Sequence, residues 1–373
     1  MQLSESARAV FAVLAAAGTA TRPQLAAGAG LSKPTVSSAV AELESAELAA
    51  HSGTAFGATG RSAAVYRLGP AAGTVLAVDL GPAQTRVRGC ALDGSLLAER
   101  TGSRPEAADV VREVLKELPA GAPLRTVVVA VGDVITQGPE GAGMRPATAK
   151  AGPVFDAMAV ALPPGVPVHL ENNVNCAALA ELHEGAARGR HSFGYLRIGV
   201  GIGLGIVIGG HVLRGANGAA GEVARLPYPW DEDRGPRQEA LEEHIGVRSL
   251  LRRTEQAWQD ADGPCPRTAD RLFALSAEGH ATARAMVARH AADVGRLAAA
   301  VTAVLDPGLI VLGGATGTDP QLLPGVRAEL ARLSWPTEVV SSTVGESGTV
   351  TGASRLAVAR GIQTVTGGTP VKH

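Results

Sequence analysis

The stretch TRPQLAAGAGLSKPTVSSAVAELESA, residues 21–46, decides the fold of the N-terminal part of the chain. Thr21 is a suitable N-cap for a short helix with Pro23 in its first turn, and Gly28 and Gly30 are expected to end that helix. A second helix is predicted to begin directly after this turn. The stretch therefore predicts two short helices joined by a tight, glycine-containing turn.

The second helix, predicted over residues 32–46, has two different faces. Ser32 is its N-cap and Pro34 lies in its first turn. Apolar side chains recur at spacings of four and three residues and are expected to face the interior: Val36, Val40 and Leu43. The opposite face is small, polar and cationic near its N-terminal end, with Lys33, Ser37 and Ala41. A face of this kind can enter a major groove about 12 Å wide.

These features predict a helix-turn-helix with residues 32–46 as the recognition helix, and an ordinary helical hairpin is the alternative interpretation. Strands are predicted over residues 48–51 and 64–68. The loop between them, SGTAFGATGRSA, is either a β-hairpin wing whose arginine reaches the minor groove or a mobile surface loop. The residues predicted to contact DNA are Arg22, Ser32, Lys33, Thr35, Ser37, Ser38, Gly60 and Arg61.

The composition indicates two or three globular units in a chain of 373 residues, of which 46% are hydrophobic and 18% charged. The net charge of −1 gives no general attraction to nucleic acid, so any such contact must be local. Three scattered cysteines indicate a reducing, cytoplasmic location without disulfide bonds. The longest uncharged apolar run, residues 198–210, is too short and glycine-rich to span a membrane.

Beyond a short linker at residues 69–73, an alternating β/α pattern occurs twice, which predicts two homologous lobes with a cleft between them. Each copy has a strand, a glycine turn, a second strand, a hairpin turn, and later a helix followed by a strand. The first copy comprises strands 75–79, 85–92 and 126–131 with helix 105–118. The second comprises strands 195–198, 204–208 and 309–312 with a helical region over 281–304.

Six segments, taken together and in this order, resemble the ROK family of bacterial repressors, open reading frames and sugar kinases. They are VLAVDLG from residue 75, ENNVNCAALAE from 171, GVGIGLGIVI from 199, GANGAAGEVARL from 215, LDPGLIVLGG from 305 and GASRLAVARG from 352. The resemblance covers nearly the whole chain and is to the transcriptional-regulator branch, which adds a winged helix to a sugar-kinase-like body.

The resemblance implies an α/β fold with an N-terminal winged helix-turn-helix at residues 1–70. A two-lobed, actin-like and hexokinase-like ROK domain, a duplicated ribonuclease H-like fold, is expected to follow. Its small lobe would comprise residues 71–175, to which a C-terminal helix at 352–367 returns, and its large lobe residues 176–351.

Departures from the kinase pattern predict that the chain is not an enzyme and has no catalytic residue. Family kinases follow the first-strand aspartate with Gly-Gly-Thr, whereas here Pro82 and Ala83 follow Gly81; proline has no N–H to donate and alanine no hydroxyl. Val200 replaces the threonine of the second glycine loop. Asn173 stands where the kinases have an aspartate general base, and an amide cannot serve as a base near neutral pH.

The zinc site of the family is also expected to be absent, and no cofactor is predicted. Arg225 stands at the position of the family's histidine. The following stretch, PYPWDEDRGPRQEALEEH, has no cysteine and cannot build a thiolate site. His244, at its end, is expected to be a solvated helix residue.

Sugar-contacting positions of the family are retained at Asn172, Glu222 and Glu242, where amide and carboxylate oxygens suit hydroxyl groups. With Asn173 and Arg225 these form the predicted ligand site, and Arg225 favours an anionic ligand such as a sugar phosphate or sugar acid. The alternative is that these residues are relics that satisfy local backbone groups.

The overall prediction is a cytoplasmic transcriptional regulator, a repressor of carbohydrate-related genes. Its predicted partners are a pseudo-palindromic operator and a sugar-like effector bound in the interlobe cleft; it is expected to form a homodimer or homotetramer and to bind no membrane. Two alternatives stay open. One is an ATP-dependent sugar kinase that retains a winged helix, and the other is an oligomeric DNA-binding protein that needs no ligand.

Overall fold

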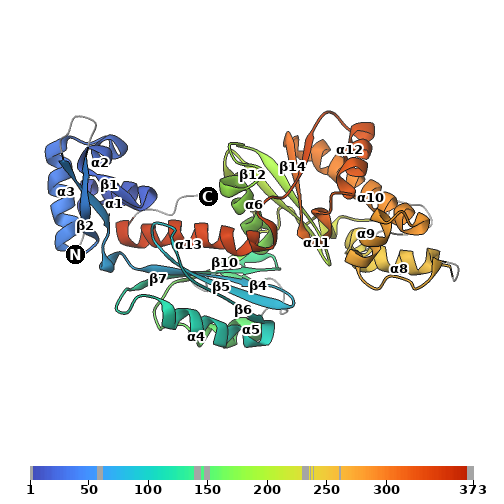
Figure 1. Ribbon diagram of the computed structural model, residues 1–373, viewed down its shortest axis with the longest axis horizontal. Helices are drawn as coiled ribbons and strands as arrows, with labels where there is room; N and C mark the ends of the chain where they lie inside the picture. Colours follow the sequence, from blue (N-terminus) through green and yellow to red (C-terminus); the bar gives the residue numbers. More distant parts are fainter. Residues whose placement is uncertain are drawn as a thin grey trace. The chain divides into compact units, whose positions relative to one another are not determined.

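The computed structural model describes residues 3–56, 62–137, 144–146, 152–228, 235, 237, 239–259 and 262–367. The chain divides into two compact units, each built around one five-stranded sheet (Figure 1). The first unit comprises Met1–Asn173 and Val350–Lys372, and the second comprises Val174–Thr349.

The N-terminal part of the first unit consists of three helices and a small antiparallel sheet of strand order β1-β3-β2. Its elements are α1 (Glu5–Ala17), β1 (Thr19–Thr21), α2 (Arg22–Ala29), α3 (Lys33–Ser45), β2 (Ala49–Phe56) and β3 (Ser62–Leu68). The helices form because their apolar residues recur at helical spacing and meet in one core. Fully buried members of this core are Val10, Phe11, Leu14, Leu25, Val36 and Leu43.

Helix α3 occupies the predicted span, and its N-terminus has the predicted cap, since Ser32 Oγ accepts a hydrogen bond from Thr35 N at 3.3 Å. Gly30 ends α2 in the left-handed conformation at φ 66°. The prediction that Gly28 ends this helix was wrong. Gly28 lies inside α2, where a Cβ atom would stand 2.7 Å from Val13 Cγ1, so the missing side chain lets α2 approach α1.

The predicted strands at 48–51 and 64–68 are longer in the structure. Strand β2 runs to Phe56 and β3 begins at Ser62, so the pairing takes up most of the predicted loop. Alanine, threonine and glycine give little hydrophobic alternation there, which explains why the extension was not predicted.

The first five-stranded sheet has the order β10-β7-β4-β5-β6, with β4, β5 and β6 antiparallel and β7 and β10 parallel to β4. Helices α4 and α5 cover one face and α13 the other (Figure 1). The elements are β4 (Thr74–Leu80), β5 (Gln84–Ala91), β6 (Leu96–Ser103), η2 (Arg104–Glu106), α4 (Ala107–Glu117), β7 (Leu124–Val131), β8 (Ile135–Gln137), β9 (Met144–Pro146), α5 (Gly152–Ala159), β10 (Val168–Asn172) and α13 (Gly348–Thr366).

The second sheet repeats this topology in the order β13-β12-β11-β14-β15. Helix α6 packs on one face, where Gly203 and Gly205 let it approach β12, and α10 and α12 pack on the other. The elements are α6 (Asn173–Glu184), β11 (Phe193–Ile198), β12 (Ile202–Ile208), β13 (His211–Val212), η3 (Val223–Arg225), α7 (Ala240–Ile245), α8 (Val247–Ala257), α9 (Ala269–Ala277), α10 (Ala281–Leu305), β14 (Leu309–Gly313), α11 (Gly314–Gly317), α12 (Leu322–Leu333), β15 (Glu338–Ser341) and η5 (Gly345–Ser347). The twofold repeat read from the sequence is therefore present as two sheets of one topology.

Candidate functional site

The exposed face of α3 is built by its apolar stripe. Because Val36, Ala39, Val40 and Leu43 are buried and α3 packs against α1 and α2, the opposite face of the helix is exposed to solvent. The exposed residues predicted to contact DNA on this helix are Lys33, Ser37 and Ser38, with Ser32 just before it. This face therefore combines one cation with short hydroxyl side chains.

Three of the predicted contact residues also form hydrogen bonds at the start of this helix. Thr35 is half-buried, and its hydroxyl lies 2.7 Å from Ser32 Oγ, so the two side chains form one capping pair. Ser38 Oγ donates to Pro34 O at 3.3 Å. These hydroxyls are fixed in position by the helix itself.

Arg22, at the start of α2, lies over the ring of Tyr66 with 5.1 Å between the guanidinium carbon and the ring centroid. This contact joins α2 to β3 through a cation–π interaction. Burial raises the pKa of Tyr66, and the charge of Arg22 opposes that shift. The other two predicted DNA contacts, Gly60 and Arg61, lie outside the described residues.

A contact that sequence reasoning missed ties α1 to α3. Glu42 accepts hydrogen bonds from Ser4 N at 2.8 Å and from Ser4 Oγ at 2.6 Å, and these bonds lower the pKa of its carboxyl. Ser4 Oγ also caps α1 by accepting from Ala7 N. No local pattern marks this contact, because its two residues lie 38 positions apart in the chain.

The first glycine loop, residues 81–83, connects β4 and β5 and is held by Arg104. Arg104 Nη1 donates to Gly81 O at 3.0 Å, and Arg104 N donates to Ala83 O at 3.1 Å. One loop carbonyl thus accepts from the Arg104 guanidinium and the other from the backbone amide of the same residue. Pro82 contributes no N–H group, as expected from the sequence.

Asn172 and Asn173 lie in the first unit, where β10 ends and α6 begins. Asn172 Nδ2 donates to Asp133 O at 3.1 Å. Asn173 is buried, with its amide group beside Gly132. The two amides are thus brought together next to the segment that follows β7.

Glu222, Arg225 and Glu242 lie in the second unit, on two elements that share one core. Glu222 Oε2 is 3.6 Å from Arg225 Nε across the short helix η3, which packs against α7. On α7, Glu242 Oε2 accepts from Ile202 N at 3.2 Å and so holds the second glycine loop. The structure therefore brings these three predicted residues to one region of the second unit.

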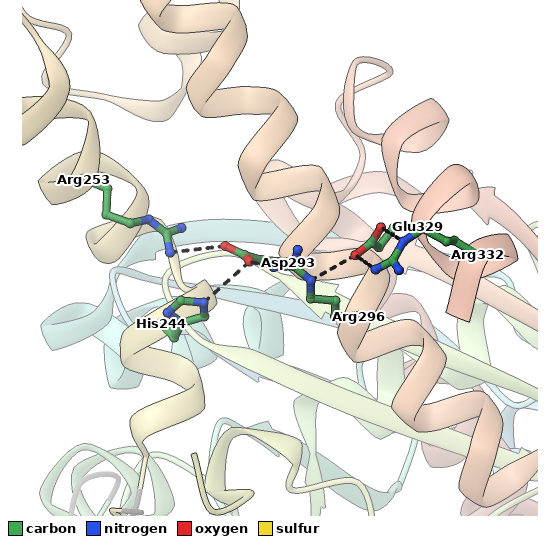
Figure 2. Close-up of polar contacts among 6 residues, drawn as sticks. All are labelled: His244, Arg253, Asp293, Arg296, Glu329 and Arg332. Carbon is green, nitrogen blue, oxygen red and sulfur yellow. Dashed lines mark hydrogen bonds and ion pairs between the residues drawn. The ribbon is translucent and has the colours of Figure 1, made fainter. Parts of the chain in front are cut away.

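His244 lies on helix α7 as expected, but its side chain is only 28% exposed and has a charged partner. Its Nε2 lies 3.6 Å from Asp293 Oδ1, and its ring lies 4.7 Å from that of Tyr228. Asp293, on α10, is only 3% exposed and also pairs with Arg253 at 3.2 Å and with Arg296 at 2.9 Å (Figure 2). No local pattern could reveal this partner, because Asp293 lies on a different helix much further along the chain.

Figure 2 shows that this cluster continues from Asp293 through Arg296 to Glu329 and Arg332, so that it spans α7, α8, α10 and α12. Burial acts to raise the pKa of Asp293, but the hydrogen bond from His244 and the charges of His244, Arg253 and Arg296 outweigh it, and the pKa lies below its usual value. The cluster therefore holds an ionised carboxylate inside the second unit.

The described residues contain neither a candidate metal cluster nor a candidate membrane-spanning helix. Among these residues, no three His, Cys, Asp or Glu side chains are grouped in a way that could hold a metal ion. Within the same part of the chain, no helix combines the length and apolar character that a membrane crossing requires.

Comparison with known sequences gives a family match and enzyme relatives. The family model described as the ROK family matches residues 75–360. N-acetylmannosamine kinase of Salmonella typhi is 28% identical over 288 residues, which cover 72% of this chain and 92% of the kinase. Bifunctional enzyme NanE/NanK of Brucella melitensis is 31% identical over 199 residues, or 52% of this chain. The matched region spans only 36% of that bifunctional enzyme's length.

Solved structures share the fold over different lengths. A ROK family transcriptional regulator, a homologue of the E. coli MLC protein, has a TM-score of 0.72 at 18% identity and covers 97% of this chain and 98% of its own. A ROK family glucokinase from Streptomyces griseus, in complex with glucose and AMPPNP, has a TM-score of 0.60 at 21% identity. It covers 76% of this chain and 99% of its own.

Proposed function

The chain belongs to the ROK family, and from that premise we propose that it is a DNA-binding transcriptional regulator, a repressor of carbohydrate-related genes controlled by a sugar-like effector. We propose three domains: a winged helix-turn-helix at residues 1–70, a small lobe at 71–175 with the helix at 352–367, and a large lobe at 176–351. A homodimer or homotetramer would present two recognition helices to a pseudo-palindromic operator.

The observation that carries the proposal is the length of each match. Kinases that are matched over 92–99% of their own length account for only 72–76% of this chain. The regulator fold accounts for 97% and so includes the N-terminal helices and sheet that precede the family match at residue 75. A segment that the kinases do not need supports a function other than sugar phosphorylation alone.

The exposed face of α3 supports DNA contact by that segment. Lys33 can pair with a phosphate, and Ser37 and Ser38 are small enough for the helix to approach base edges. Arg22 and Arg61 are proposed to contribute further contacts, Arg22 from the start of α2 and Arg61 from the wing.

The two glycine loops and Asn173 favour a regulator over the kinase alternative. Phosphate would require N–H donors and cations at the first loop, but Pro82 lacks the donor, and the Arg104 guanidinium already donates to the carbonyl of Gly81. The amide of Asn173 cannot take a proton from a sugar hydroxyl. The kinase alternative rests on the names of the sequence relatives.

The proposed effector site consists of Asn172, Asn173, Glu222, Arg225 and Glu242. Carboxylate and amide groups accept from and donate to vicinal hydroxyls, and Arg225 adds a cation for a phosphate or acid group of the sugar. If the site has become a relic, the protein would bind DNA without an effector. A thermal-shift screen against sugars, sugar phosphates and sugar acids separates these two cases, because only a working site gives a shift that Glu222→Ala abolishes.

The test of the regulator proposal measures both activities on the full-length protein. We expect a DNA duplex selected by the protein to bind with a steep salt dependence, and Lys33→Ala to lower the slope of log K against log salt by about 0.9. Lys116→Ala, on α4, is the matched control and should leave the slope unchanged. No ADP should appear above background with N-acetylmannosamine or glucose; sugar-dependent ADP without DNA binding would establish the kinase alternative.

A further inference from the structure

Residues 69–73 form the connector between the N-terminal segment and the first five-stranded sheet, and this connector is folded rather than extended. Residues Pro70–Ala72 form a single turn of 3₁₀-helix, η1. Ala71 N donates to Glu47 O at 3.0 Å, and Gly69 N donates to Leu48 O at 2.9 Å. The connector is therefore hydrogen-bonded to the end of the helix-turn-helix on one side.

Arg125, on β7, holds the other side of the connector. Its Nε donates to Ala72 O at 2.9 Å, and its Nη2 donates to Ala71 O. The planar guanidinium can serve two neighbouring carbonyls at once, which a lysine ammonium cannot do with fixed geometry. The side chain is half-buried, and burial lowers the pKa of its guanidinium. Arg125 thus forms a clamp, defined here as its two hydrogen bonds to Ala71 and Ala72.

The connector begins and ends with a glycine, and at both positions its backbone approaches a neighbouring carbonyl too closely for any side chain. A Cβ atom on Gly69 would stand 2.1 Å from Glu47 O. Gly73 has φ +92°, and a Cβ atom there would stand 2.3 Å from Pro123 O, whose carbonyl already accepts from Thr74 N at 2.9 Å. The backbone therefore lies in direct contact with its neighbours where it enters and where it leaves η1.

The stem of Arg125 also lies against α13. A Cβ atom on Gly361 would stand 3.6 Å from Arg125 Cβ and 2.6 Å from Val75 Cγ1, so α13 packs closely over this point of the sheet. At its last turn, Thr366 O accepts from Arg8 Nη1 of α1 at 3.4 Å. Helix α13 begins at Gly348 in the second unit and passes into the first unit at Val350.

Arg125 is therefore the one described side chain that these contacts place on the sheet, on α13 and on the connector together. We propose that Arg125 is a positioning residue that fixes the N-terminal DNA-binding segment to the first lobe and makes it follow α13. This inference rests on the proposed function and deepens it. It assigns Arg125 as the residue through which a movement of the ROK lobes would change the spacing of the two recognition helices.

The clamp makes a specific prediction about spacing. Two recognition helices held rigidly in an oligomer bind best when the half-sites lie about 34 Å apart or a multiple of that. Released segments adapt to other spacings but bind the correct one less tightly, because they lose more freedom on binding. A residue that merely stabilised the fold would weaken all duplexes alike.

The experiment compares Arg125→Gln with the wild-type protein on three duplexes made from the sequence that the wild type selects. They are the full site, the full site with five base pairs inserted between its halves, and one half-site. We expect Arg125→Gln to bind the full site roughly 5- to 30-fold more weakly and to discriminate much less against the insertion, with unchanged half-site affinity. Equal loss on all three duplexes, or no loss on any, would overturn the proposal.

The control is Arg327→Gln, which removes an arginine that donates Nε and Nη2 to the backbone oxygen Val339 O in the second unit. It should leave the spacing preference intact. Arg125→Lys keeps the charge but not the paired geometry, and we expect it to behave like Arg125→Gln.

Amide hydrogen exchange, measured on the free protein, tests the clamp without DNA. In Arg125→Gln the connector amides of Gly69, Ala71 and Ala72 should exchange at least tenfold faster, while those of β4 and β7 stay protected. If the wild type selects no duplex, the proposed function fails, yet faster exchange confined to the connector would still establish the clamp. Unchanged exchange at the connector would overturn it.

Discussion

The two five-stranded sheets share one strand order but are covered by different kinds of helix. Among the described residues, the buried side chains of α4 and α5 are all apolar, and they include Val111, Val114 and Met158. On the second sheet, α10 buries Val294 and Leu297 on one side while carrying the Asp293 cluster on another. One topology thus tolerates an apolar helix layer in one copy and a charged junction of four helices in the other.

The apolar helix contacts on the first sheet and the charged contacts on the second reflect the different numbers of helices that meet there. Helices α4 and α5 contact each other and share the apolar core of the first sheet, and apolar burial is enough for that. Helix α10 also meets α7, α8 and α12, and directional charge pairs fix the orientation of helices more closely than apolar contacts do. The cluster lies beside α7, which carries Glu242, so we expect it to hold part of the proposed effector site in place.

The glycine loops of the two sheets show the same contrast on a smaller scale. In the first, Arg104 donates to the carbonyls of Gly81 and Ala83; in the second, Glu242 accepts from the amide of Ile202. One loop is held by a cation and the other by an anion, each supplied by this chain. Both loops are therefore engaged internally, which supports the proposal that neither binds nucleotide.

The largest expected effect comes from removing the centre of the charged junction. Asp293→Ala leaves Arg253, with a side chain only 11% exposed, without its charge partner, and should lower the free energy of unfolding of the second unit by about 3–5 kcal/mol. Urea unfolding followed by tryptophan fluorescence measures this, because Trp230, Trp258 and Trp335 all belong to that unit.

The double variant Asp293→Leu/Arg253→Met is its control, because it replaces the pair by apolar groups. It should recover much of the lost stability. A single variant as stable as wild type would mean that the cluster does not hold the four helices together.

A second expected effect is a pH dependence restricted to the second unit. His290 on α10 is fully buried, and neither of its ring nitrogens has a hydrogen-bond partner among the described residues. Burial, followed by the charge of Arg253, lowers the pKa of His290 to about 4, while the charge of Asp293 acts in the opposite direction. The unfolded chain binds a proton at this histidine near its usual pKa of about 6.5, whereas the folded unit does not until pH is about 4. The free energy of unfolding therefore decreases by on the order of 3 kcal/mol as the pH falls from about 6.5 to about 4.

Below that window the lowered pKa of Asp293 acts in the same direction, since its stabilising charge is lost as the carboxylate takes up a proton. The measurement is the tryptophan-detected unfolding free energy of the wild type and of His290→Leu between pH 7.5 and 4. The variant should show a clearly shallower decline. Parallel curves would show that His290 does not cause the dependence.

The smallest expected effect is a loss of stability when the side chain that holds each glycine loop is removed, and it should differ between the two loops. Glu242→Ala should destabilise the second unit by about 1–3 kcal/mol, because a hydrogen bond to a charged acceptor is lost at a half-buried position. Arg104→Ala should cost the first unit less, since Arg104 N keeps its bond to Ala83 O. Glu243→Ala, at an exposed neighbour of Glu242, is the control and should change stability by less than about 0.5 kcal/mol. Equal losses for Glu242→Ala and Glu243→Ala would contradict the role given to Glu242.

Local patterns predicted much of the fold. Caps at Ser32 and Gly30 and the spacing of Val36, Val40 and Leu43 located α3 and the turn before it. The repeated strand–glycine–strand pattern predicted the repeat now seen in both sheets. Such signals depend on residues within a few positions of one another, so a sequence displays them directly.

The remaining features depend on residues far apart in the chain. The Ser4–Glu42 tie, the Arg125 clamp and the pairing of His244 with Asp293 join positions separated by 38 to 54 residues. No local period marks such partners. Residues carried over from the family resemblance, such as Glu222 and Glu242, lie on elements that contact one another, η3 and α7, while their role in binding stays a prediction.

The central claim, that the N-terminal segment makes this ROK protein a DNA-binding regulator, is tested most directly by selecting duplexes from a random pool with the full-length protein. The account predicts enrichment of a sequence with two-fold symmetry whose half-sites lie about one helical turn, or a multiple of it, apart, and loss of that enrichment in a Lys33→Ala/Arg61→Ala variant. A pool that remains random after repeated rounds with the wild-type protein would contradict it.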